Sequence, residues 1–262
     1  MTESSVPDSP RPFRYAGHGE NARTGIALCH GFTGSPLSIM PWAEHLAAHG
    51  FAVTVPLLPG HGTHWRDLAR TSWRDWYGTF EESYLELAGR TSRCFVAGLS
   101  MGGAVALRAA ARHPVAGVAV VNPGLSFYDR RVRYIGALKH VMRTTAPIEE
   151  ENPTSAPTDD GDYSRTPLAA VHELKKLFRS TSRSLPSITA PALVFKSAQD
   201  AVVPPSSLAM ISKRIGSKDL RVVPLPHSGH VATLDLDAPL ILEESAAFFL
   251  QHATDRVASE PS

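Results

Sequence analysis

Short runs of apolar and β-branched residues alternate along this chain with longer segments in which apolar residues recur at helical spacing. The runs lie at 25–29, 51–55, 94–97, 115–121, 192–195 and 220–224. The helical segments lie at 37–49, 72–87, 102–112, 206–215 and 239–251. Strands that are apolar along their whole length are typical of a parallel sheet covered by helices on both faces. The pattern therefore predicts an α/β fold built on a mostly parallel, doubly wound sheet.

The alternation is interrupted once, between about residues 122 and 186, where no clear strand is predicted. A basic stretch at 130–143 precedes an acidic, proline-rich stretch at 147–162. A helix then follows, for which we expect Thr166 as the N-cap and Pro167 at the first helical position. Long insertions in compact domains often cover a binding site, so we interpret this segment as a lid. A surface excursion without function is the alternative.

Length and charge exclude several classes of protein. The chain has 262 residues and a formal net charge of +1, so no strong field draws it to nucleic acid. Its apolar runs are far shorter than the roughly 20 residues that span a bilayer, so we expect no stable membrane insertion. The basic stretch at 130–143 is interpreted as a solvated face, with transient contact to an anionic lipid surface as the alternative.

The two ends of the chain and its cysteine content indicate how many domains it has and where in the cell it acts. Residues 1–12 and 253–262 are rich in Ser, Pro and charge, which predicts flexible tails around one domain at 13–252. The first residues lack the apolar core of a signal peptide, and two cysteines are too few for a disulfide framework. We therefore expect a cytoplasmic protein, either a monomer or a weak homodimer.

The sharpest chemical signal is the Gly-Leu-Ser-Met-Gly sequence at 98–102, which an apolar run enters and a helix of small residues leaves. A sharp turn from strand to helix strains the serine backbone and leaves room only for glycine two residues to either side. The serine hydroxyl would stand at the carboxyl end of a central strand, where open α/β sheets bind ligands. We interpret Ser100 as a nucleophile; a plain glycine-rich turn is the alternative.

A serine hydroxyl needs a base to accept its proton and an acid to orient that base. After a turn of this kind, the acid and then the histidine follow the serine along the chain. Asp200 lies just past the run at 192–195 and is the expected acid. Of the two histidines after the next strand, we favour His230 over His227, because the Ser-Gly pair before it leaves the loop free to turn its ring inward.

Several other polar residues receive structural interpretations. His227 is expected at the end of a strand, and Asp235 and Asp237, which follow both histidines, are expected to serve as loop and helix-capping residues. His61 and His64 stand three apart, but no second pair or carboxylate lies at ligand spacing. We therefore expect no metal site and no cofactor.

A nucleophilic serine also needs two backbone N–H groups aimed at the oxyanion that forms on its substrate. One is expected from Met101, the residue after the nucleophile. The other is expected from the glycine-rich loop at 30–36, where Phe32 is the natural donor. This loop lacks the Lys-Ser/Thr ending of a phosphate-binding loop.

Five motifs in this order resemble those of the bacterial monoacylglycerol lipases and related small carboxylesterases of the α/β-hydrolase superfamily. They are HGFTGSP at 30–36, PGHGTH at 59–64, GLSMGG at 98–103, DAVVPP at 200–205 and SGHVATLD at 228–235. The resemblance runs from about residue 25 to residue 249. It implies an α/β-hydrolase fold with Ser100 as nucleophile, Asp200 as acid and His230 as base. It also implies Phe32 and Met101 as the oxyanion donors.

The same resemblance assigns residues in the lid. In that family the lid lines a tunnel for the acyl chain, and an acidic residue before a Tyr-x-x-Thr-Pro run helps to hold glycerol. This chain has such a run at 163–167, with Asp160 before it. The resemblance thus implies Asp160 and the apolar Ile148 as lid contacts. The stretch at 152–163 is longer and richer in proline than the family pattern.

The resulting expectation is a serine hydrolase that cleaves monoacylglycerols or similar small lipophilic esters through an acyl-enzyme. Its partner is then a small-molecule ester. A transacylase or a serine peptidase is the first alternative, since either would keep the three catalytic residues and change only the substrate. A ligand-binding member of the fold without activity is the second, and the presence of all three residues argues against it.

Overall fold

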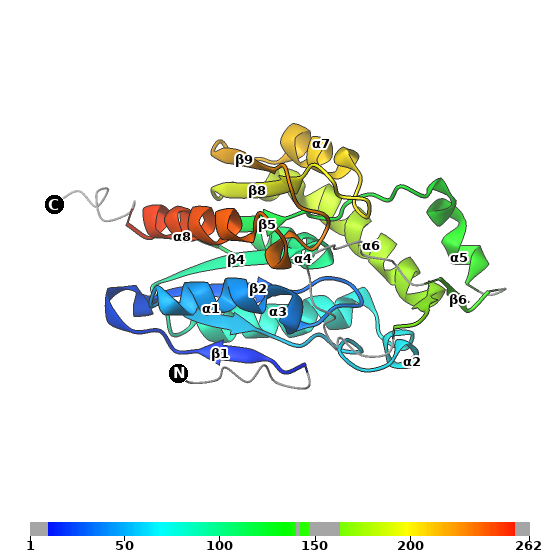
Figure 1. Cartoon of the computed structure of the whole chain (residues 1–262), viewed down its shortest axis with the longest axis horizontal. Coiled ribbons are helices and arrows are strands. Elements are labelled where there is room, and N and C mark those ends of the chain that lie inside the picture. Colours follow the sequence, from blue (N-terminus) through cyan, green and yellow to red (C-terminus); the bar gives the residue numbers. More distant parts are fainter. Residues whose placement is uncertain (1–9, 140–141, 147–162, 255–262) are drawn as a thin grey trace.

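The computed structural model of the chain describes residues 10–139, 142–146 and 163–254. They form a seven-stranded sheet in the order β1-β3-β2-β4-β5-β8-β9 (Figure 1). Its strands are β1 (Phe13–Tyr15), β2 (Thr24–Cys29), β3 (Ala52–Val55), β4 (Arg93–Leu99), β5 (Val118–Val121), β8 (Ala192–Ser197) and β9 (Leu220–Leu225). Neighbouring strands are parallel except for β1 and β3. The predicted α/β fold with a mostly parallel sheet is confirmed.

Each apolar run corresponds to a strand, and β1 is the strand of this sheet that the pattern misses. β1 has three residues, none of them fully buried, and it pairs with β3 alone at the edge of the sheet. By contrast, every residue of β2 and β5 is buried. A short edge strand has no continuous apolar run, so the pattern does not reveal it.

Two helical layers cover the sheet. One contains α1 (Met40–Ala48) and α8 (Ala238–Thr254), and the other contains α3 (Trp73–Ala88) and α4 (Met101–Ala110). Side chains of β2 alternate between the layers, with Ile26 and Leu28 in the first and Ala27 and Cys29 in the second. The remaining helices outside the insertion are α2 (Trp65–Leu68), α7 (Pro205–Arg214), and the short 3-10 turns η1 (Gly19–Arg23), η2 (Pro36–Ile39), η4 (Leu185–Ser187) and η5 (Ala232–Leu234).

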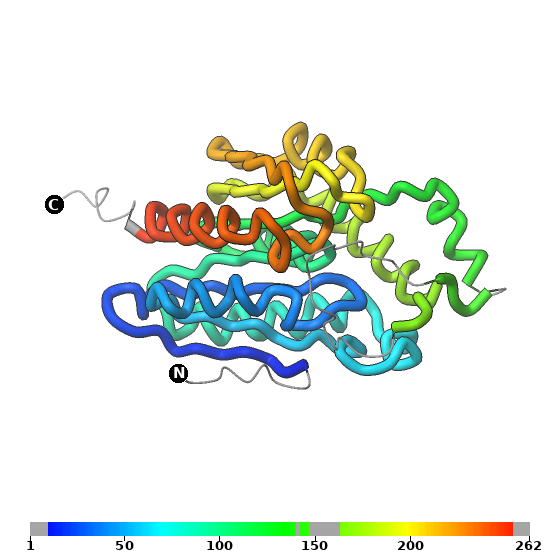
Figure 2. Tube along the Cα trace, viewed as in Figure 1, coloured from blue at the N-terminus to red at the C-terminus, as the bar shows by residue number. Residues whose placement is uncertain are grey.

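The expected insertion lies between β5 and β8. It contains η3 (Arg130–Tyr134), α5 (Ile135–Leu138), the paired strands β6 (Thr144–Thr145) and β7 (Thr166–Pro167), and the long helix α6 (Leu168–Ser184). Figures 1 and 2 show α5 and β6 at the opposite end of the molecule from the last turn of α8. The predicted apolar face of α6, with Leu174, Leu177 and Phe178, packs into the same core as α3 and α4.

Two expectations for the insertion are wrong. Thr166 is not the N-cap of α6 and Pro167 is not its first residue, because the helix begins at Leu168 with Pro167 as its N-cap. Both residues instead form β7 and pair with β6, in a segment where no strand was predicted. The N–H of Leu168 also donates to the carbonyl of Arg143 at 3.1 Å, which continues this extended pairing up to the start of the helix. Strands of two residues have no periodicity that a sequence pattern could report.

Part of the prediction lies outside the described residues. Ile148 and Asp160, the expected lid contacts, are among these, as are residues 1–9 and 255–262 of the expected tails. Within the described chain, no helix combines the length and the apolar character needed to cross a bilayer. The arginines described in the basic stretch at 130–143 are exposed, in agreement with a solvated face.

Candidate active site

Ser100 occupies a strained turn between β4 and α4. Its backbone has φ 57° and ψ −116°, a left-handed conformation that costs energy for any residue with a side chain. Its N–H donates to the carbonyl of Val121 at 2.9 Å, which fixes the turn against β5. A Cβ at Gly98 would lie 2.4 Å from the carbonyl carbon of Gly102, and one at Gly102 would lie 2.0 Å from the carbonyl oxygen of Cys29. The two glycines of the motif are therefore required by space, as predicted.

The structure brings Ser100, His230 and Asp200 into one chain of hydrogen bonds. The hydroxyl of Ser100 and Nε2 of His230 are 2.8 Å apart, and Nδ1 of His230 is 2.9 Å from Oδ1 of Asp200. The three residues follow β4, β9 and β8, so the parallel sheet gathers them at the carboxyl ends of its strands. His230 and Asp200 are buried, whereas His227 is exposed. This arrangement can pass the proton of the serine hydroxyl to the imidazole.

Asp200 is surrounded by hydrogen-bond donors. Its Oδ1 also accepts from the N–H groups of Val202 and Val203 at 3.0 and 2.9 Å, and its Oδ2 accepts from Nζ of Lys196. Burial alone would raise the pKa of Asp200, but the donors from His230, Lys196 and Val203 outweigh it and lower the pKa to about 2. The carboxylate is therefore charged at neutral pH and holds the imidazole with Nδ1–H directed toward it.

Asn122, for which the sequence alone indicates no role, anchors the loop that carries His230. Its side chain is fully buried and donates to the carbonyl of His230 and to Oγ of Ser197, both at 2.8 Å. Its Oδ1 accepts from the N–H of Ser197 at 2.9 Å. The position of Asn122, a polar residue directly after the apolar run of β5, was the available signal for this role. Its hydrogen-bond partners could not be predicted, because they are far away in the sequence.

Two carboxylates brace the same loop. Asp235 accepts from the N–H of Gly229 and Asp237 from the N–H of His227, each at 2.8 Å. Oγ of Ser228 accepts from the N–H of Asp237 at 2.8 Å. The interpretation of Asp235 and Asp237 as loop residues is confirmed, and these contacts hold both sides of the turn before His230.

The two expected oxyanion donors are Met101, which follows Ser100 directly, and Phe32, in a loop that borders Ser100 at Gly31. Met101 is the first residue of α4, and the first N–H groups of a helix have no partner within it. Phe32 follows Gly31, where an added Cβ would be 3.6 Å from Cβ of Ser100, so this loop borders the nucleophile. The next residue, Thr33, has φ 61°, which marks a tight turn. The direction of the two N–H groups toward a substrate remains a prediction.

His30 and His61 build the loops around the site. Nε2 of His30 accepts from the N–H of Leu58 at 3.2 Å, so Nδ1 carries the proton and donates to the carbonyl of Gly31 at 2.9 Å. The ring of His61 lies 5.2 Å from that of His30 and 5.6 Å from that of Trp76, centre to centre. Burial, and then the nearby His30, lower the pKa of His61 well below its ordinary value. In the part of the chain that the structure describes, no group of three or more metal-ligating side chains is present.

Comparison with known proteins assigns this chain to a family. The family model described as Hydrolase_4, serine aminopeptidase S33, matches residues 20–237. The chain belongs to this family. A thermostable monoacylglycerol lipase from Bacillus sp. strain H-257 is 38% identical over an alignment of 246 positions, which covers 90% of this chain and 94% of the relative. A carboxylesterase from Bacillus subtilis strain 168 is 25% identical over 241 residues, which are 92% and 96% of the two chains.

Solved structures agree with the family assignment. One described as LipS and LipT, two metagenome-derived lipolytic enzymes, superposes with a TM-score of 0.86 and 33% identity over 94% of this chain and 99% of that one. A monoacylglycerol lipase of Paleococcus ferrophilus has a TM-score of 0.75 and 18% identity, over 92% and 99% of the two chains. The resemblance and the α/β-hydrolase fold inferred from the five motifs are thus confirmed. As a member of the Hydrolase_4 family, the chain is a hydrolase.

Proposed function

We propose that this chain hydrolyses monoacylglycerols or similar small lipophilic esters, with Ser100, His230 and Asp200 as its catalytic residues. The observation that carries the proposal is the unbroken chain of hydrogen bonds from Ser100 to Asp200 at a strained turn. The names of the relatives, a monoacylglycerol lipase and a carboxylesterase, support an ester substrate.

In the first half of the reaction, Oγ of Ser100 attacks the ester carbonyl while its proton moves to Nε2 of His230. The imidazolium that forms donates from Nδ1 to Asp200, whose charge stabilises it. The N–H groups of Phe32 and Met101 bind the negative oxygen of the tetrahedral intermediate. The intermediate then collapses: the bond to the alcohol oxygen breaks, His230 gives its proton to that oxygen, and the acyl group stays on Ser100.

In the second half, a water molecule replaces the alcohol. His230 takes a proton from the water, whose oxygen attacks the acyl-enzyme carbonyl, and the same two N–H groups bind the second oxyanion. The second intermediate then collapses: the bond between the acyl carbon and Oγ of Ser100 breaks, and His230 returns the proton to that oxygen. The products of the full cycle are one alcohol and one carboxylic acid, which ionises at neutral pH. For the glycerol ester, Ile148 and Asp160 remain the proposed lid contacts.

A hydrolysis panel tests the proposal. Wild type is assayed on monoacylglycerols and on p-nitrophenyl esters of graded chain length, together with Ser100→Ala and with Ser206→Ala, an exposed serine of α7, as the matched control. We expect Ser100→Ala to lower kcat by roughly 10⁴ to 10⁶ and Ser206→Ala to leave it unchanged. Turnover of short p-nitrophenyl esters alone would overturn the glycerol-ester part. Retention of a tenth of the activity in Ser100→Ala would overturn the catalytic assignment.

The name of the family favours one second candidate, an aminopeptidase. The same three residues would then cleave an amide and release an amine. Aminoacyl p-nitroanilides in the same panel separate the two. A kcat/KM higher on these amides than on every ester would replace the esterase proposal.

A further inference from the structure

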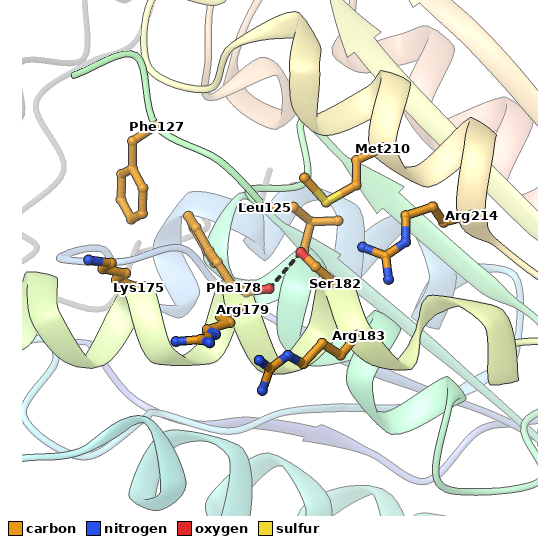
Figure 3. A pocket seen from close by; sticks show the side chains of 9 residues that line it. All are labelled: Leu125, Phe127, Lys175, Phe178, Arg179, Ser182, Arg183, Met210 and Arg214. Atoms are coloured by element: carbon orange, nitrogen blue, oxygen red, sulfur yellow. Dashed lines mark hydrogen bonds between the residues drawn. The ribbon is translucent and has the colours of Figure 1, made fainter. Parts of the chain in front are cut away.

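An open groove of about 340 Å³ lies between α6, α7 and the loop that follows β5 (Figure 3). It is lined by Leu125, Phe127, Lys175, Phe178, Arg179, Ser182, Arg183, Met210 and Arg214. Ser100, His230 and Asp200 are not among the lining residues. The groove is therefore distinct from the proposed catalytic centre.

The floor of the groove is apolar. The rings of Phe127 and Phe178 stack with their centres 4.9 Å apart at 31°. The hydroxyl of Ser182 donates to the carbonyl of Phe178 at 2.7 Å, so it is already paired within its own helix (Figure 3). Met210 extends this surface from α7, and its flexible thioether chain adapts to varied apolar shapes. A hydrocarbon chain is the kind of group that such a floor accepts.

The rim of the groove is cationic. Lys175, Arg179 and Arg183 recur every four residues and so share one face of α6, while Arg214 comes from α7. Like charges at this spacing destabilise a helix unless acids compensate them. Among the described residues, no carboxylate lies within ion-pair distance of the three arginines, although Lys175 donates to backbone carbonyls of η3 at 2.6 and 3.1 Å.

The groove adjoins the loop that supports the nucleophile. The N–H of Gly124 donates to the carbonyl of Ser100 at 3.0 Å, and the next residue, Leu125, lines the groove. A Cβ at Gly124 would lie 2.5 Å from Cζ of Phe178, so the loop packs directly on the apolar floor. The loop at Gly124 and Leu125 therefore contacts both the backbone of the nucleophile turn and the groove.

We propose that the groove is a second binding site, outside the catalytic centre, for a fatty-acid carboxylate. This inference rests on the proposed function, because ester hydrolysis releases such an anion. The alkyl chain lies on Phe127, Phe178 and Met210. The carboxylate accepts hydrogen bonds from Arg214, whose guanidinium group Figure 3 shows directed into the groove, while Arg179 adds positive charge to the rim. Guanidinium groups bind carboxylates through two parallel N–H donors, which an ammonium cannot do. A volume near the lower end of ligand sites fits a single alkyl chain.

Calorimetric titration with sodium decanoate tests the proposal without turnover, so a failure of the esterase assignment does not affect the result. The protein is titrated before and after treatment with an alkyl fluorophosphonate, which blocks a nucleophilic serine. The test variant is Arg179→Gln/Arg214→Gln. The matched control is Lys213→Gln/Lys218→Gln, which removes the same charge at exposed positions outside the groove. Thermal melting verifies that both variants fold.

We expect the dissociation constant for decanoate to rise at least tenfold in the test variant and to stay unchanged in the control and in the blocked protein. Decanol, which lacks the charge, and acetate, which lacks the chain, should each bind at least tenfold more weakly than decanoate. Equal decanoate affinity in wild type and test variant overturns the proposal, as does loss of binding on blocking the serine. A different outcome would identify a membrane-binding surface instead. In that case the protein would sediment with phosphatidylglycerol vesicles only when Arg179 and Arg214 are present, and it would bind decanoate no better than decanol.

Discussion

The ammonium group of Lys196 donates a hydrogen bond to Oδ2 of Asp200, the carboxylate oxygen that does not face His230. The same ammonium donates to the carbonyl of Val203 at 2.9 Å, in the turn that follows Asp200. The side chain of Lys196 therefore holds the acid of the proposed triad on the side opposite His230 and ties it to β8. Because Lys196 is mostly buried, this contact is only weakly screened by solvent.

Replacing Lys196 tests whether this contact positions the carboxylate. We expect Lys196→Met to lower kcat by about tenfold, corresponding to ~1.4 kcal/mol of transition-state stabilisation, with little change in KM. The reason is that Asp200 keeps its backbone donors but loses the donor that fixes its second oxygen. Steady-state kinetics on one ester measure both constants. Lys196→Arg should recover most of the loss, and a kcat equal to wild type in Lys196→Met would contradict a positioning role.

The pKa of Asp200 predicts a pH window for stability. The pKa is lowered from 3.8 to about 2, so the folded state favours the charged form. The resulting stabilisation, of the order of 2 kcal/mol, is complete above about pH 4 and is lost as the pH falls through 2. Denaturant unfolding of wild type and Asp200→Asn at several pH values measures it. The difference between their unfolding free energies should shrink between pH 4 and pH 2, and a constant difference would contradict the prediction.

The crowded backbone at the turn of Ser100 predicts that one added methyl group lowers the free energy of unfolding strongly. Gly102→Ala places a Cβ 2.0 Å from the carbonyl oxygen of Cys29, so we expect a loss of more than about 3 kcal/mol of unfolding free energy. Gly78→Ala, in the middle of α3, is the matched control, because in the described chain its added Cβ would have no atom within 4 Å apart from its neighbours and the backbone of its own helix. It should be stabilising by roughly 0.5–1 kcal/mol. Thermal and denaturant unfolding measure both; equal effects would contradict the steric argument.

Asn122 couples stability to activity. Asn122→Ala removes its buried hydrogen bonds to His230 and Ser197 and places alanine at φ 44°, so we expect a loss of about 2–4 kcal/mol. The freed loop should also lower kcat, because the ring of His230 is no longer fixed against Ser100. Asn122→Asp keeps the acceptor for Ser197 but loses the donors, and should lie between wild type and Asn122→Ala in both measurements. Unchanged kcat in Asn122→Ala would show that the loop holds His230 without this side chain.

The sequence by itself determined the strands that pass through the core and the identity of the proposed nucleophile. The apolar runs of β2 and β5 predict their own burial, because each run must be covered on both faces wherever it lies in the sheet. The Gly-x-Ser-x-Gly pattern likewise reports the absence of space beside one turn, although only the crowding at Gly98 arises within the turn itself and that at Gly102 comes from Cys29 of the neighbouring strand β2. The hydrophobic pattern does not predict short strands such as β1 and β7, because two or three residues are too few to show a periodicity.

Only the tertiary structure decided what supports those residues. Asn122 meets Ser197 because β5 and β8, far apart in the sequence, are neighbours in the sheet with Val121 opposite Phe195. The groove between α6 and α7 likewise depends on how two helices pack. Patterns along a chain record which side chains are buried, whereas the partner of each buried polar group depends on strand order and helix packing, which no single segment encodes.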